Sequence, residues 1–164
     1  MDPFPALIRA LDARKGDILA FAQDLISIPS ENPPGNCYRE CADRIRAELD
    51  RVGLAYQIVE TPGHPERPRY NFLGFHGSGQ RTLYFHGHYD VVPAQSREQF
   101  TPRIENSRLV GRGSADMKAA VAGMIYAAAL IKASAIPLNG RLGLCIVADE
   151  ETGGQGGSRY LDEI

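Results

Sequence analysis

The 164-residue sequence has no tryptophan, no long apolar run and no block of charge of one sign. No stretch approaches the ~20 apolar residues that a membrane-spanning helix needs, so we expect no membrane segment. The formal net charge of -2, without a basic block, disfavours nucleic acid or an anionic membrane as a partner. A hydrophobic share of 43% and a charged share of 23% are typical of one globular domain with a real core.

Cysteine is also scarce, and its three positions form no disulfide pattern. Cys37 and Cys41 are separated by one helical turn, and Cys145 lies far away. A zinc site at the first two would need further ligands that are not near in the sequence, so we interpret all three as reduced structural residues. Asp2 stands where a signal peptide would carry a base. We therefore expect a cytoplasmic protein.

Hydrophobic periodicity and turn residues predict an α/β chain. Helices are expected at Phe4–Leu11, Gly16–Ile28, Tyr38–Val52 and Met117–Ser134, with another beginning at Ser158. Strands are expected at Ala55–Glu60, Tyr70–Phe75, Thr82–His86 and Arg141–Ala148, with a hairpin-type connection at 76–79 and a tight turn within Ile104–Val110. The apolar run 141–148 is typical of a central strand covered on both faces. This order predicts a three-layer α/β/α sandwich around a mixed, mostly parallel sheet.

A histidine and an acid follow the third expected strand. If the strand continues, His88 and Asp90 face the same way, and Asp90 can accept the ring N–H that His88 does not offer to a metal. His86 shares this parity and is a rival ligand. The alternative is that both are ordinary strand-end histidines.

Further acids come later in the chain. Asp116 stands directly before the long apolar helix, where it could cap the helix, bind metal, or bridge two metals. Asp149, Glu150 and Glu151 follow the central strand, and three acids at a buried strand end are costly unless a cation is near. The alternative is a solvated acidic turn. With a metal, one Glu could ligate while the other acts as general base, and the spacing leaves open which does which.

The glycine-rich stretch 153–157 differs from a phosphate loop. It lacks the Lys-Ser/Thr pair of a P-loop and the spacing of a dinucleotide fingerprint. We therefore interpret it as a loop that gives backbone clearance before a helix.

Together these stretches resemble the M20 metallopeptidase family, the group of acetylornithine deacetylase, succinyl-diaminopimelate desuccinylase, aminoacylase and carboxypeptidase. The matching stretches are Ile28–Ser30 with Asn32–Gly35, Gly87–Pro93, Phe100–Pro102, Gly111–Gly113 with Asp116–Lys118, and Asp149–Glu151 with Gly153–Gly154. Each motif is weak alone, but all of them in order form a strong signal. The Asn-Pro-Pro-Gly stretch favours the deacetylase/desuccinylase branch.

The resemblance implies a role for each residue. His88 would ligate one zinc ion, Glu151 the other, and Asp116 would bridge both beside an unusual cis peptide. Glu150 would be the general base and Asp90 would orient His88. The implied reaction is hydrolysis of an N-acyl amino acid or a short peptide by a zinc-activated water. Cobalt or manganese could replace zinc, because carboxylate-rich sites accept them too.

The resemblance is partial. Family members are more than twice as long, carry a further ligand carboxylate and a ligand histidine, and have a smaller dimerisation and lid domain. Residues 1–164 are therefore expected to be the N-terminal portion of the catalytic domain, with little or no activity alone, and full-length relatives are expected to be homodimers. The alternative is a non-catalytic truncated metal-binding module that needs a partner chain, which an open sheet edge would favour.

Overall fold

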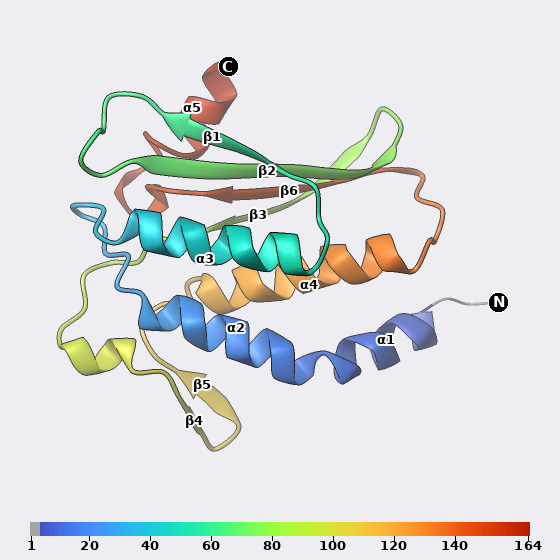
Figure 1. Cartoon of the computed structure of the whole chain (residues 1–164), viewed down its shortest axis with the longest axis horizontal. Helices are drawn as coiled ribbons and strands as arrows, with labels where there is room; N and C mark the ends of the chain where they lie inside the picture. Colours follow the sequence, from blue (N-terminus) through green and yellow to red (C-terminus); the bar gives the residue numbers. More distant parts are fainter. Residues whose placement is uncertain (1–3) are drawn as a thin grey trace.

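The structure is a computed structural model that describes residues 4–164, so Asp2 lies outside the described part. It contains one main sheet with helices on both sides (Figure 1). The helices on one side are α1 (Phe4–Ala13), α2 (Lys15–Ser27), α3 (Tyr38–Arg51) and α4 (Lys118–Ala133), and the short α5 (Ser158–Glu163) lies on the other. Within residues 4–164, the second helical layer of the expected sandwich thus consists of α5.

The main sheet has the strand order β1-β2-β6-β3. Its strands are β1 (Gln57–Thr61), β2 (Arg69–Ser78), β6 (Gly140–Val147) and β3 (Thr82–His88). β2 runs antiparallel to both β1 and β6, whereas β3 and β6 are parallel. A small hairpin joins β4 (Arg103–Glu105) to β5 (Arg108–Val110), which confirms the tight turn expected there. Two short 3-10 helices, η1 (Arg97–Phe100) and η2 (Glu150–Thr152), complete the described elements.

The α/β class and the mixed sheet are confirmed, but two details of the prediction are wrong. The sheet is not mostly parallel, since only the β3–β6 pairing is parallel. The connection after β2 is not a hairpin either: β2 continues to Ser78 and pairs with β6 instead of β3. The reason is that β6 is buried from Leu142 to Val147. The apolar surface of β6 is buried most completely when this strand lies in the middle of the sheet. β6 therefore separates β2 and β3, which are neighbours in sequence.

Helix α4 forms the centre of the helical layer. Its Ala-rich, apolar sequence lets it pack on β3 and β6 with one side and on α1 and α2 with the other. Val121, Ala122 and Ile125 are fully buried there. No helix among residues 4–164 is both long and apolar enough to cross a bilayer.

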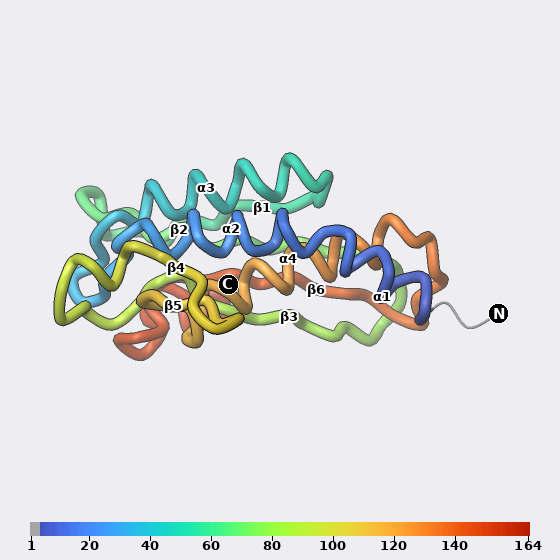
Figure 2. Tube along the Cα trace, turned by 90° about the horizontal axis from the view of Figure 1, so that it is seen from below, coloured from blue at the N-terminus to red at the C-terminus, as the bar shows by residue number. Residues whose placement is uncertain are grey.

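The parallel pairing of β3 and β6 positions the chemistry. Both strands end at the same edge of the sheet, where His88 is the register partner of Val147. The loops 28–37, 89–100 and 148–157 gather at this end of the molecule in both views (Figures 1 and 2). Residues far apart in the sequence therefore meet where ligands bind in open α/β sheets, beyond the carboxyl ends of the strands.

Candidate metal centre

His88, the last residue of β3, is 3% exposed and has both ring nitrogens engaged. Nδ1 lies 3.0 Å from the Asp90 backbone oxygen and 3.3 Å from Asp90 Oδ1. Nε2 lies 3.1 Å from Asp116 Oδ1 and 3.6 Å from Glu150 Oε2. The ring therefore turns Nε2 toward a group of carboxylates.

These carboxylates control the protonation of His88. Burial lowers the pKa of the imidazole, but the hydrogen bond and charge of Asp90, together with Glu150 and Asp116, outweigh it and raise the pKa to about 9. The position of Nε2 therefore has a strongly negative potential, which favours positive charge.

Asp90 is fully buried and holds the neighbouring chain segments together. Its Oδ2 accepts hydrogen bonds from Asn32 Nδ2 (2.9 Å) and the Glu151 backbone N–H (3.0 Å), and its Oδ1 accepts one from the Glu150 backbone N–H (3.2 Å). Burial raises the pKa of this carboxyl, but hydrogen bonds from His88, Asn32 and the Glu151 N–H lower it below its usual value. Ionised Asp90 thus fastens the start of η2 beside His88.

The last two members of the group come from loops. Asp116 lies in the turn before α4 with a side chain that is 76% exposed, and its peptide bond to Met117 is cis, as the resemblance implied. The N-cap alternative is wrong, because Met117 is the N-cap residue and no side chain caps α4. Glu151 Oε1 accepts the Val92 backbone N–H at 3.3 Å. Ligand atoms of His88, Asp116 and Glu151 lie within 4.8 Å of one another.

This donor set fits a divalent metal. One imidazole nitrogen and two carboxylates are donor types that zinc prefers. Burial and the negative charges of Asp116 and Asp90 raise the pKa of the Glu151 carboxyl, while His88 opposes them. A cation would relieve this repulsion. Glu150, with a side chain that is 49% exposed, adds a further carboxylate to the group. The individual roles of His88, Asp116, Glu151, Glu150 and Asp90 stay predictions.

Other residues singled out in the sequence lie outside this group. His86 is exposed on β3, although it shares the parity of His88. The glycine-rich loop provides the backbone clearance expected of it: a Cβ at Gly156 would lie 2.5 Å from Asp149 Oδ2, and one at Gly157 would overlap the Ala148 backbone oxygen.

The structure also adds residues that the sequence analysis missed. The buried Asp149 carboxylate pairs with Arg69 at 3.0 Å and accepts the Tyr38 hydroxyl at 2.9 Å. Arg69, at the start of β2, therefore supplies positive charge to Asp149, one of the three consecutive acids. Asn32 reaches both Asp90 and Thr152 Oγ1 (2.8 Å). The need for a cation was the available signal for Arg69, but periodicity does not indicate which arginine meets it.

These features define a class of protein: an α/β domain in which adjacent strand ends hold a candidate site for a divalent metal. Comparison with known sequences narrows the class. Residues 84–163 match the family described as Peptidase family M20/M25/M40. A succinyl-diaminopimelate desuccinylase from Buchnera aphidicola subsp. Acyrthosiphon pisum (strain APS) is 38% identical over an alignment of 151 residues that covers 89% of this chain. Another from Xylella fastidiosa (strain M23) is 35% identical over an alignment of 157 residues that covers 90% of this chain.

This chain belongs to the M20 peptidase family. It spans 38% of the length of each of these two curated relatives.

Solved structures share the fold. Human carnosine dipeptidase 1 matches with a TM-score of 0.79 at 21% identity, over 99% of this chain and 38% of that one. The di-peptidase Dug1p from Saccharomyces cerevisiae matches with a TM-score of 0.77 at 24% identity, over 97% of this chain and 36% of that one. The arrangement of strands and helices that positions the candidate site is therefore common to these proteins.

Proposed function

We propose that residues 1–164 are the N-terminal part of the catalytic domain of a zinc-dependent amidohydrolase. The reaction would be hydrolysis of an N-acyl amino acid or a short peptide. The observation that carries this proposal is the convergence of His88, Asp116 and Glu151 within 4.8 Å at the carboxyl ends of two parallel strands. The sequence similarity to two desuccinylases supports an acyl amino acid as the substrate.

His88, Asp116 and Glu151 would hold the metal, which supplies Lewis acidity for a substrate carbonyl and an attacking water. Asp90 contributes by occupying the Nδ1 side of His88, so that Nε2 stays directed at the carboxylates.

Glu150 is the residue we propose as general base. Its backbone N–H is held by Asp90 Oδ1 at 3.2 Å, whereas its side chain is half exposed with Oε2 close to His88. Oε2 can therefore take a proton from water and later deliver it to the nitrogen of the leaving amine.

Calorimetric titration with zinc and cobalt tests the metal site directly. We expect the wild-type chain to bind both, and His88→Ala, Asp116→Asn and Glu151→Gln each to weaken binding by about tenfold or more, since each removes a ligand. Matched controls are His64→Ala, Asp162→Asn and Glu163→Gln, which change exposed residues of the same types. Equal affinities in both sets would contradict the proposed ligands.

Turnover is a separate readout. We propose little or no activity for this chain alone, because the three-residue group described supplies three ligand atoms, fewer than two tetrahedral zinc ions require. N-succinyl-diaminopimelate and N-acetylornithine are suitable substrates for the assay. Robust zinc-dependent hydrolysis of either would contradict the expected inactivity and support the reaction.

A second candidate function is a metal-binding module that acts with a partner chain. It is favoured by the β3 edge, which within residues 4–164 pairs only with β6, and by the exposed apolar side chains Leu83 (67%), Tyr84 (49%) and Phe75 (47%). Size-exclusion mass together with zinc content separates the two functions. A monomer that binds zinc favours the catalytic domain, whereas stable assembly that is needed for zinc binding favours the module.

We further propose that the protein works in the cytoplasm and that its full-length relatives are homodimers. Three unpaired cysteines support a reducing compartment. The proposed partners are small N-acyl amino acids or short peptides, without nucleic acid or membrane.

A further inference from the structure

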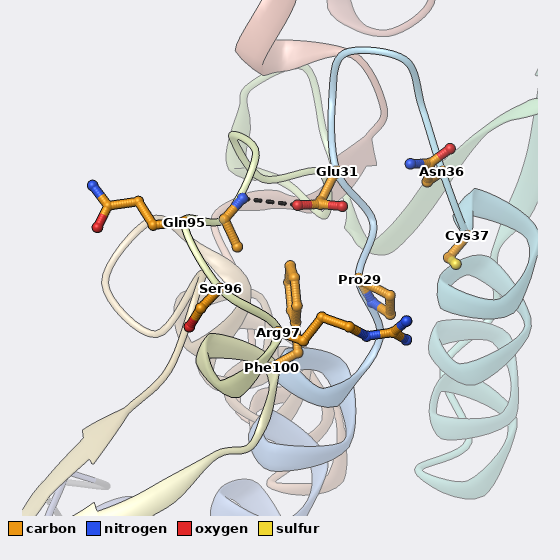
Figure 3. A pocket seen from close by; sticks show the side chains of 9 residues that line it. Pro29, Glu31, Asn36, Cys37, Gln95, Ser96, Arg97 and Phe100 are labelled. Atoms are coloured by element: carbon orange, nitrogen blue, oxygen red, sulfur yellow. Dashed lines mark hydrogen bonds between the residues drawn. The ribbon is translucent and has the colours of Figure 1, made fainter.

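A second candidate site is a pocket of about 540 Å³ (Figure 3). It is formed by the loop that follows α2 and by the segment 94–100. The chain between Val92 and Ala94 connects the two sites: the Val92 N–H binds Glu151 Oε1, and the Ala94 N–H binds Glu31 Oε1 at 2.8 Å. The pocket has a volume that is ordinary for a small-molecule site.

Two opposite charges line this pocket without neutralising each other. Glu31 lies on one side, and Arg97 lies on the opposite side together with the Phe100 ring (Figure 3). Glu31 uses Oε1 for the Ala94 N–H, and its Oε2 has no hydrogen-bond partner among residues 4–164. Over the same range, the exposed Arg97 guanidinium makes neither a hydrogen bond nor an ion pair. The neighbouring acid Glu98 accepts the Ser96 hydroxyl instead.

The pairing of charges narrows the class of ligand. A simple anion would be attracted by Arg97 but repelled by Glu31. A simple cation would be attracted by Glu31 but repelled by Arg97. A group that carries both charges satisfies both residues. An ammonium can donate to Glu31, and a carboxylate can accept two parallel hydrogen bonds from the Arg97 guanidinium. Pro29 and Phe100 offer apolar surface for a methylene chain.

We propose that this pocket binds an amino-acid head group, with its ammonium on Glu31 and its carboxylate on Arg97. The role of the ligand as part of a substrate rests on the proposed function, because a diamino acid acylated at one end keeps such a head group at the other. Binding of the head group alone requires no metal.

Matched probes test the charge requirement on the purified chain in EDTA. The probes are L-norleucine, hexanoate, which lacks the ammonium, and pentylamine, which lacks the carboxylate. Backbone amide shifts in NMR titrations should saturate with norleucine at Ala94 and Arg97. We expect each single-charge probe to bind at least about tenfold more weakly than norleucine. Hexanoate binding as tightly as norleucine would overturn the assignment of Glu31, and absence of saturable shifts would overturn the site.

Variants locate the contacts. Arg97→Gln and Glu31→Gln should each weaken the binding of norleucine by about tenfold, since each removes one charge. The amide introduced by Glu31→Gln keeps an acceptor for the Ala94 N–H. Arg108→Gln and Glu66→Gln are exposed controls that should leave binding unchanged. Equal weakening in the controls, or none in the pocket variants, would overturn the proposal. The titrations in EDTA contain no free metal. The norleucine result can therefore be interpreted even if the zinc-binding or hydrolysis experiments fail.

Discussion

The buried acid Glu48 and the acids around His88 have opposite surroundings. Glu48 on α3 is 1% exposed and is fully paired. Its Oε1 accepts hydrogen bonds from Arg51 Nη2 (2.6 Å) and the Tyr126 hydroxyl (2.7 Å), and its Oε2 accepts one from Arg44 Nη1 (3.0 Å). Around His88, by contrast, carboxylates face one imidazole and one another.

The two groups consequently differ in their ionisation. Burial raises the pKa of Glu48, but the hydrogen bonds from Arg51, Tyr126 and Arg44 outweigh it and lower the pKa below its usual value. For Glu151, burial and the charges of Asp116 and Asp90 raise the pKa. A buried acid supplied with its own cations stabilises the fold, whereas a group of acids without enough cations is suited to bind one.

Asp149 provides the strongest test of this contrast, because it is an acid of the candidate site that has its own cation. Asp149→Asn leaves the Arg69 guanidinium, whose side chain is 11% exposed, without its charge partner. We expect the free energy of unfolding to fall by about 3 kcal/mol in urea denaturation. Asp162→Asn on α5 is the exposed control, expected to stay within ~0.5 kcal/mol. Similar losses in both variants would mean that the Arg69 pair does not stabilise the fold.

Glu48→Gln should have the next largest effect. Gln keeps one acceptor oxygen but loses the charge-assisted hydrogen bonds, and we expect a loss of about 2 kcal/mol in the same denaturation experiment. The loss is smaller than at Asp149 because Arg44 and Arg51 are partly exposed and can be hydrated. Glu40→Gln, exposed on the same helix, is the control. If both variants are equally stable, the Glu48 network contributes no more to the free energy of unfolding than an exposed ion pair does.

The same network predicts a pH dependence. Since the pKa of Glu48 is lower in the folded state than in the unfolded one, its contribution is complete above the unfolded pKa of about 4.3 and is lost as the pH falls through the folded pKa. The stability difference between wild type and Glu48→Gln should therefore shrink as urea denaturation is repeated from about pH 6 to about pH 3. A difference that grows toward acid pH would contradict the direction of the shift.

Glu151→Gln should have the smallest effect on unfolding in EDTA. The raised pKa means that the folded state disfavours the ionised carboxyl, so the neutral amide should change stability by no more than ~0.5 kcal/mol, in the stabilising direction. Added zinc should then stabilise the wild type and have little effect on this variant. A loss in EDTA as large as that of Glu48→Gln would show that Glu151 is a structural acid.

Local signals predicted most elements well. The expected helices at Gly16–Ile28 and Tyr38–Val52 agree with α2 and α3 to within one residue at each end, because apolar periodicity and turn residues act over a few positions. The pairing of β2 with β6 was not predicted, since the connection after Phe75 looked like a hairpin. Which strands become neighbours depends on contacts between distant segments.

The same division applies to the candidate site. Local pattern alone indicated that His88, Asp116 and Glu151 follow strands or precede a helix, and that such acids require a cation. The folded chain decided that Arg69 provides this cation for Asp149, while Asp90, Asp116 and Glu150 all face the single imidazole of His88. A sequence pattern specifies each residue's position within its own element. Charge pairing depends on distances across the fold, and these are set by how the apolar strand β6 is buried between β2 and β3.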